Sequence, residues 1–263
     1  MKPDYKNWIP KGLMVTLIAA CAVLSLLAGF LFGLTLATGA WYMIVVSVAV
    51  ICGTVALIWF TIKYSDMRAS FSYDGERRLS ARIIEKTAER VILPKGGKGL
   101  DVGCGSGALA IACAKNNPEA EIVGMDRWGK EYASFSKNLC EKNAAAEGVG
   151  NVTFTQGDAL ALPFDDQTFD AVFSNYCYHN IPSKDRQSIL KETFRVLKKG
   201  GTFAIHDIFT VQKYGDMQAF LEELKREGFE SAELIDTTKG AYLSEVEAKK
   251  YMLGGSKLLI GKK

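Results

Sequence analysis

A glycine-rich turn and two isolated acids are the residues in this chain best suited to hold a ligand. The turn is formed by seven consecutive residues: Asp101, Val102, Gly103, Cys104, Gly105, Ser106 and Gly107. Glycines let the backbone approach a ligand closely and adopt angles that other residues avoid. Asp126 and Asp158 each follow a later expected strand, where a carboxylate can accept from ribose hydroxyls or an adenine amino group. Because carboxyl ends of parallel strands share one edge, the pattern predicts a single adenosine-like ligand.

Two ligand classes fit a glycine turn of this kind. Gly103, Gly105 and Ala108 satisfy the looser GxGxxA form of the dinucleotide-binding fingerprint, so a nicotinamide-dependent oxidoreductase is one alternative. A pyrophosphate, however, needs no acid beside the first glycine, and Asp101 stands there. An acid at that place suits the ammonium group of an amino-acid moiety, which favours a ligand that carries one.

Four motifs in order resemble the class I S-adenosylmethionine-dependent methyltransferases. Residues 100–107 look like that family's first motif, and Asp126 matches its ribose-binding acid. Residues 157–170 and 195–201 resemble motifs of the small-molecule branch, which includes the ubiquinone and menaquinone biosynthesis methyltransferases. The resemblance covers about residues 71–263 and implies S-adenosylmethionine as cofactor.

The resemblance also implies individual roles at the cofactor site. Gly103, Gly105 and Gly107, with Cys104 and Ser106 between them, would form the bed for the methionine part. The remaining cofactor contacts would come from Asp101 at the ammonium group, Asp126 at the ribose, Asp158 and the Ala159 backbone at the adenine, and Asn175 beside the sulfonium. The family often has a small apolar residue after the ribose acid, whereas this chain has Arg127, so Trp128 is expected to flank the adenine instead.

Three residues are candidates for the chemistry itself. Methyl transfer needs a general base only where the acceptor must lose a proton, and histidine is the usual one near neutral pH. The chain has two histidines: His179 follows the expected fourth strand and His206 ends the fifth. Tyr176 is expected beside the reacting methyl group. For each of the three, a purely structural role is the alternative.

The elements that position these residues alternate along the chain. From Lys98 onward, seven short stretches read as strands: 98–102, 121–125, 152–156, 169–174, 202–206, 232–235 and 257–261. Helical patterns at 109–115, 131–146, 184–197 and 216–226 separate them. Alternation of this kind predicts an α/β fold, a doubly wound and mostly parallel sheet like that of Rossmann-like methyltransferases.

The N-terminal region is different in character. Between Gly12 and Ile62 there is no Asp, Glu, Lys, Arg or His, and the runs 12–37 and 41–62 are each long enough to cross a bilayer as a helix. We therefore expect a transmembrane hairpin (1–63), a linker with an amphipathic lid helix (64–97) and a methyltransferase domain (98–263). Basic residues flank the hairpin but are absent from its turn, so the positive-inside rule predicts a multi-pass protein of the cell membrane with both termini and the catalytic domain cytoplasmic.

The composition limits which partners and acceptors we expect this protein to bind. The net charge is only +3, and no basic stripe with interleaved aromatics suggests nucleic acid. The six cysteines are scattered without a CxxC pair, so neither a disulfide framework nor a metal site is expected. The hairpin favours a small apolar or lipid-like acceptor for methylation. A water-soluble acceptor stays open, as does a catalytically inactive membrane-anchored scaffold.

Overall fold

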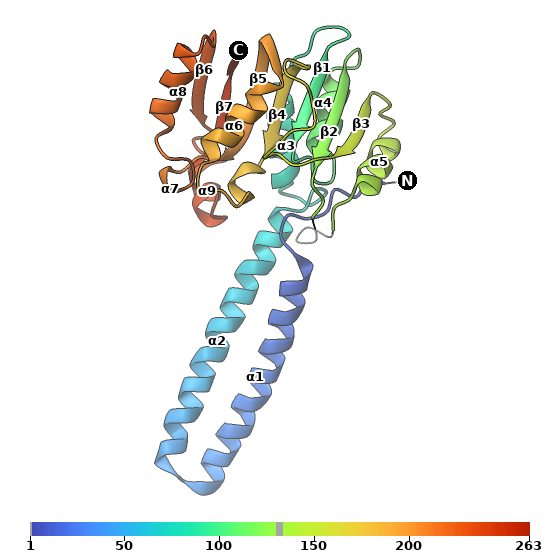
Figure 1. Ribbon diagram of the computed structural model, residues 1–263. Helices are drawn as coiled ribbons and strands as arrows, with labels where there is room; N and C mark the ends of the chain where they lie inside the picture. The colour runs from blue at the N-terminus through green and yellow to red at the C-terminus, as the bar shows by residue number, and fades with distance from the viewer. Residues whose placement is uncertain (1, 130–133) are drawn as a thin grey trace. The chain divides into compact units, whose positions relative to one another are not determined.

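The computed structural model describes residues 2–129 and 134–263, and these form two compact units (Figure 1). One unit is residues 7–80. The other joins residues 2–6 to residues 81–263 and contains the whole sheet.

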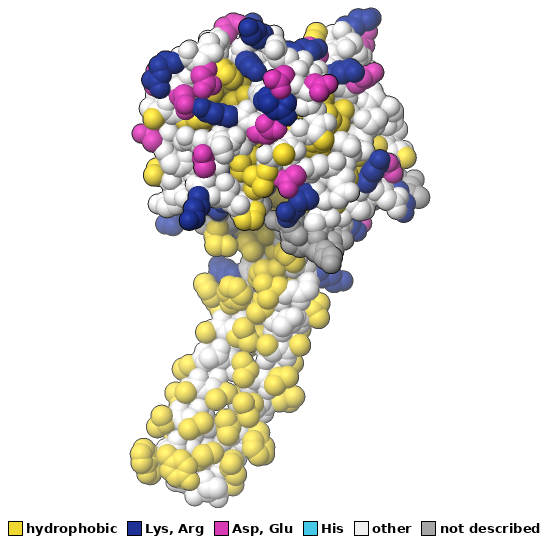
Figure 2. Space-filling model, in the orientation of Figure 1, with side chains coloured by type: hydrophobic (Ala, Val, Ile, Leu, Met, Phe, Trp, Pro, Cys, Tyr) yellow, Lys and Arg dark blue, Asp and Glu magenta, His cyan; other side chains and the backbone are white. Residues whose placement is uncertain are grey.

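The first unit is built on a helical hairpin. Helix α1 (Lys11–Thr38) ends at Gly39, whose left-handed φ of 66° lets its N–H donate to the Thr35 carbonyl oxygen at 3.0 Å. Helix α2 (Trp41–Ser70) returns beside it. Both are long and apolar enough to cross a membrane, with mean hydropathy of 2.5 and 2.6 in their most apolar windows. Apolar side chains cover the visible face of the hairpin (Figure 2).

The second helix is longer than the sequence suggested. We expected a linker from Tyr64, but α2 continues to Ser70. The segment from Lys63 to Ser70 contains neither proline nor glycine, so nothing in it interrupts the helix. The linker expectation for Tyr64–Ala69 was wrong for that reason.

The sheet of the second unit confirms the predicted doubly wound architecture. Its strands are β1 (Lys98–Val102), β2 (Glu121–Asp126), β3 (Val152–Gln156), β4 (Phe169–Asn175), β5 (Leu197–Ile208), β6 (Ser231–Asp236) and β7 (Ser256–Lys262). Their order is β3-β2-β1-β4-β5-β7-β6, and β7 alone runs antiparallel to its neighbours. The order reverses between β1 and β4, and ligands bind at such a reversal beyond the carboxyl ends of the strands.

Helices cover both faces of this sheet (Figure 1). They are α3 (Leu79–Ala88), α4 (Ala108–Asn116), α5 (Lys137–Ala146), α6 (Arg186–Arg195), α7 (Val211–Tyr214), α8 (Met217–Arg226) and α9 (Glu245–Lys250), with the 3-10 turn η2 (Tyr178–Asn180) after β4. The core lies between the layers, where Leu100, Phe203 and Ile205 are almost fully buried.

Side-chain caps explain why two helices begin later than predicted. Helix α5 starts at Lys137 because Ser136 accepts from the Leu139 N–H at 3.2 Å; the earlier part of its predicted range includes residues 130–133, outside those described. Helix α6 starts at Arg186 because Asp185 accepts from the Ser188 N–H at 3.0 Å. The short elements η2, α7 and α9 were not predicted, since three to six residues carry no helical period.

Candidate active site

The glycine turn after β1 is shaped by close packing against the chain that follows β4. Gly103 has a φ of 77°, and its N–H donates to the Met125 carbonyl oxygen at 2.8 Å. A Cβ at this position would lie 2.1 Å from the Cys177 Sγ, so a side chain is excluded. Gly107, with a φ of 82°, leads directly into α4. The turn therefore places the N–H groups at the start of α4 along the carboxyl edge of the sheet.

Asp126 ends β2 and is hydrogen-bonded to two backbone amides. Its Oδ2 accepts from the Gly105 N–H at 2.9 Å and its Oδ1 from the Trp128 N–H at 2.7 Å. The Trp128 indole N–H donates in turn to the Gly105 carbonyl oxygen at 3.0 Å. Trp128 and the ribose-acid candidate thus lie directly against the glycine turn.

Asp101 is a buried carboxylate whose charge is not compensated. It is 1% exposed, and neither carboxylate oxygen has a hydrogen-bond partner among the described residues. Burial raises the pKa of the Asp101 carboxyl well above its usual value, and the nearby Asp126 adds a smaller rise. The Ala110 N–H lowers this pKa in part, although it does not complete a hydrogen bond to Asp101. An unpaired buried charge is costly. A cationic ligand group beside Asp101 would remove that cost, which fits an ammonium group.

The other expected cofactor residues differ in exposure. Asp158 is half-buried in the loop after β3, where its Oδ1 accepts from the Leu160 N–H at 2.9 Å, and Ala159 beside it is buried. Arg127 is exposed. Ser106 and Cys104 are buried within the turn, and burial raises the pKa of the Cys104 thiol well above its usual value. Cys104 is therefore a neutral filler of the turn rather than a nucleophile.

His206 lies inside the sheet rather than in the acceptor position expected for a base. Its Nδ1 is 2.9 Å from the Asn175 Oδ1 and its Nε2 is 2.9 Å from the Thr237 Oγ1. Burial lowers the pKa of His206 to about 3, so the ring is neutral near pH 7. With both ring nitrogens engaged and the side chain fully buried, the structure places His206 as a support for Asn175.

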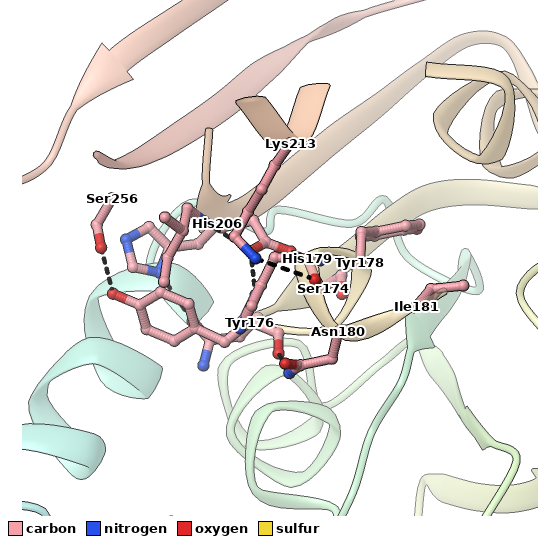
Figure 3. Close-up of polar contacts among 12 residues, drawn as sticks. Ser174, Tyr176, Tyr178, His179, Asn180, Ile181, His206, Lys213 and Ser256 are labelled. Atoms are coloured by element: carbon pink, nitrogen blue, oxygen red, sulfur yellow. Dashed lines mark hydrogen bonds and ion pairs between the residues drawn. The ribbon is translucent and has the colours of Figure 1, made fainter. Parts of the chain in front are cut away.

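Tyr176 follows β4 with an unusual backbone conformation. Its φ is 51°, a left-handed value that a bulky residue rarely adopts and that often marks a functional site. Its hydroxyl meets the Ser256 hydroxyl at 2.7 Å, and its ring packs on His206 with centroids 4.7 Å apart (Figure 3). Burial raises the pKa of Tyr176, so the phenol stays protonated and does not act as a base.

His179 forms a dyad with a buried acid. Its Nδ1 lies 2.5 Å from the Asp207 Oδ1, and its backbone N–H donates to the Asp207 Oδ2 at 3.2 Å. The Asp207 side chain is fully buried, whereas that of His179 is 15% exposed. Arg186 and Lys213 hold the turn η2 by donating to the carbonyl oxygens of Tyr178 at 3.2 Å and His179 at 3.4 Å; Figure 3 shows Lys213 beside His179. The imidazole is thus fixed through Nδ1, while part of the His179 side chain remains exposed.

Comparison with known proteins assigns the family. A family model described as "Methyltransferase domain" matches residues 93–253, more than half of the chain. The chain belongs to the methyltransferase family. A demethylmenaquinone methyltransferase of Geobacillus kaustophilus is 31% identical over 228 residues, which cover 76% of this chain and 92% of that protein.

Solved structures with a similar fold agree with this architecture. The [4+2]-cyclase SpnF superposes with a TM-score of 0.55 at 21% identity, covering 75% of this chain and 84% of its own. Phosphoethanolamine N-methyltransferase 2 of Haemonchus contortus was solved with S-adenosylhomocysteine. It superposes with a TM-score of 0.52 at 18% identity, covering 77% of this chain and 56% of its own. At these identities the likeness concerns the fold alone.

The methyltransferase uses S-adenosylmethionine as cofactor, and the residues present fit it. The unpaired Asp101 carboxylate suits the ammonium group, and the side-chain-free Gly103 lets the backbone approach a ligand. Among the described residues no group of His, Cys, Asp or Glu is arranged to hold a metal ion.

Asp207 is the site residue that sequence reasoning missed. It stands beside His206 at the end of β5, but neighbouring side chains of a strand point to opposite faces. Asp207 therefore meets His179 on one face while His206 meets Thr237 elsewhere. The only sequence signal was an acid at a strand end on the ligand-binding edge of the sheet.

Proposed function

We propose that this methyltransferase methylates a small apolar acceptor with an ionisable hydroxyl, a quinol of the demethylmenaquinone type, and that His179 is its general base. The observation that carries the proposal is the 2.5 Å contact between His179 Nδ1 and the fully buried Asp207. The relatives named demethylmenaquinone methyltransferase support the acceptor class.

Each cofactor-binding residue contacts a different part of S-adenosylmethionine in this proposal. Asp101 holds the ammonium group, Asp126 the ribose hydroxyls, and Asp158 with the Ala159 backbone the adenine. When bound, S-adenosylmethionine supplies a methyl group that its sulfonium charge activates, and it leaves as S-adenosylhomocysteine. Holding donor and acceptor in line is the main contribution of the glycine turn and of the residues that follow β4.

The dyad supplies the base. Asp207 accepts the Nδ1–H of His179, which leaves the lone pair on Nε2 to act as the base. His179 Nε2 takes the proton of the acceptor hydroxyl, and the buried carboxylate stabilises the imidazolium that results. The phenolate so formed is nucleophilic at oxygen and at the adjacent ring carbon. Methylation at carbon gives a ring ketone at first; the methylated carbon then loses its proton to solvent while the His179 imidazolium returns its proton to the ring oxygen, which restores both the aromatic ring and the neutral base.

Tyr176 and Asn175 position the reacting groups. Asn175 ends β4 and is held by His206, while the strained Tyr176 is held by Ser256. We assign both residues to the wall between cofactor and acceptor because they directly precede Cys177, which packs on Gly103 of the glycine turn. His206 acts through Asn175 and moves no proton.

The hairpin brings the enzyme to its acceptor. Helices α1 and α2 cross the membrane, and basic residues on both flanks keep the termini and the catalytic unit in the cytoplasm. A tethered enzyme meets lipid-dissolved acceptors at a raised effective concentration. This arrangement suits a quinol whose tail remains in the bilayer.

A partition experiment tests the proposal. Full-length protein in lipid nanodiscs is incubated with methyl-labelled S-adenosylmethionine and, separately, with a membrane lipid extract and an aqueous cell extract. We expect label in the organic phase, and its loss in His179→Ala. Label only in aqueous products would contradict the lipid acceptor, and no transfer with either extract would favour an inactive scaffold.

A further inference from the structure

The residues before the hairpin are bound to the catalytic unit. Residues 2–6, here called the N-terminal strap, belong to the same compact unit as residues 81–263. The Tyr5 ring is 5% exposed, and its hydroxyl donates to the Glu147 Oε1 at 3.0 Å. Glu147 in turn accepts from the Lys115 Nζ of α4 at 2.5 Å. The strap is therefore anchored by a buried aromatic side chain and a polar chain that reaches the helix after the glycine turn.

Asn143 of α5 connects the strap to the glycine turn. Its Oδ1 accepts from the Asp4 N–H at 2.7 Å, and its Nδ2 donates to the Asp4 carbonyl oxygen at 3.0 Å. The same Nδ2 donates to the Ser106 carbonyl oxygen at 3.0 Å. An amide nitrogen carries two protons, so one serves the strap and the other serves the turn.

Burial makes this amide dependent on the strap. Asn143 is 1% exposed, so water does not replace a lost partner easily. Without Asp4, its Oδ1 and one Nδ2 proton would be left unsatisfied inside the protein, at a cost comparable to a lost hydrogen bond each. The amide would then turn to other partners and release the Ser106 carbonyl oxygen.

We propose that the N-terminal strap is a positioning element for cofactor binding: it fixes the Asn143 amide, which in turn fixes Ser106 in the glycine turn. Residues that precede the membrane hairpin would thus set the affinity of a site that lies beyond it in the chain. The role goes beyond the proposed acceptor chemistry, since it concerns the cofactor alone.

The test measures the dissociation constant of S-adenosylhomocysteine by calorimetry on the full-length protein in nanodiscs, well below its unfolding temperature. Deletion of residues 2–5, and Tyr5→Ala as a milder release of the strap, should each raise this constant about two- to tenfold, as expected for one lost hydrogen bond. Lys142→Ala is the matched control, because Lys142 adjoins Asn143 in α5 but its side chain is exposed. It should bind as the wild type does.

A double-variant cycle separates positioning from simple stabilisation. In an Asn143→Ala background, deletion of the strap should have no further effect on the dissociation constant, because the link to Ser106 is already absent. A strap that only stabilises the fold would lower the unfolding temperature and leave the constant unchanged. That result, or losses that add fully in the cycle, would overturn the proposal. The acceptor is not involved, so failure of the proposed function would leave this outcome unaffected.

Discussion

His179 Nδ1 and Asp207 Oδ1 lie 2.5 Å apart although 28 positions separate the two residues in the chain. The contact exists because η2 follows β4 and Asp207 ends the neighbouring strand β5, whose parallel pairing brings both strand ends to one edge. A buried acid on Nδ1 of a partly exposed histidine is the arrangement expected of a general base that uses its second nitrogen.

Asp207→Asn should impair turnover without affecting cofactor binding. Asparagine keeps the shape of the side chain but removes the charge that stabilises the imidazolium. We expect kcat to fall by about two to four orders of magnitude, the usual contribution of a general base. The dissociation constant of S-adenosylmethionine should stay unchanged, as measured by calorimetry beside the rate assay.

The control for this substitution is Asp216→Asn. Asp216 caps α8 by accepting from the Gln218 and Ala219 N–H groups at 2.9 and 3.0 Å, a role that asparagine also fills. Wild-type turnover is expected. If Asp207→Asn also kept wild-type turnover, His179 would not be acting through Asp207.

Asp101→Asn should stabilise the ligand-free protein while weakening cofactor binding. The Asp101 carboxyl is buried without a hydrogen-bond partner among the described residues, and burial disfavours its ionised form, so a neutral amide of the same shape avoids the cost of a buried charge. The dissociation constant for S-adenosylhomocysteine should rise about 10- to 100-fold, since a hydrogen bond between charged groups contributes about 1.5–3 kcal/mol. Thermal unfolding and calorimetry on the same sample measure both effects. A lower unfolding temperature with unchanged binding would show that Asp101 is only structural.

His206 should make the folded protein less stable in acid. Its pKa is about 3 when folded and about 6.5 when unfolded, so between these values the unfolded state binds more protons. The free energy of unfolding should therefore fall as pH drops below 6.5, by up to about 1.4 kcal/mol per pH unit from this group. In His206→Gln the loss between pH 7.5 and pH 5 should be smaller by about 2 kcal/mol in denaturant titrations. An equal loss in both proteins would contradict burial of the neutral ring.

Gly103→Ala should prevent stable folding of the catalytic unit. The added Cβ would lie 2.1 Å from the Cys177 Sγ and 2.6 Å from its Cβ. Cys177→Gly removes both atoms, so the double variant should recover part of the stability lost by Gly103→Ala. Recovery should be incomplete because the φ of 77° still disfavours alanine. Thermal unfolding of the two single variants and the double variant measures the coupling between positions 103 and 177. Strictly additive losses of stability would show that the clash is not the cause.

The sequence predicted the parallel sheet well because each strand end carries a local signal. The turn at residues 101–107 needs glycines, and Asp126 and Asp158 each follow an expected strand. The position of the turn and of both acids at one edge of the sheet therefore follows from the alternation of strands and helices. Parallel pairing of β1 with β2 and of β2 with β3 brings the ends of these strands to one edge of the sheet.

Contacts between distant segments were not predictable from the sequence. Asp207 and Asn143 carry no local pattern, and their roles arise only when β5 meets η2 and when the strap lies on α5. For His206 the sequence could not distinguish the two sides of one strand end, so its burial was missed. The long α2 was missed because a polar segment without proline or glycine is read equally well as a linker or as a helix.

In the proposed reaction, His179, oriented by Asp207, activates an acceptor hydroxyl for methylation by S-adenosylmethionine. Its most direct test is methyl transfer from labelled S-adenosylmethionine to chemically reduced demethylmenaquinone in nanodiscs that contain the full-length protein. We expect labelled quinol and S-adenosylhomocysteine in equal amounts for the wild type, and a loss of at least about a hundredfold in His179→Ala with cofactor binding intact. Transfer at the wild-type rate in His179→Ala, or none in the wild type despite bound cofactor, would contradict it.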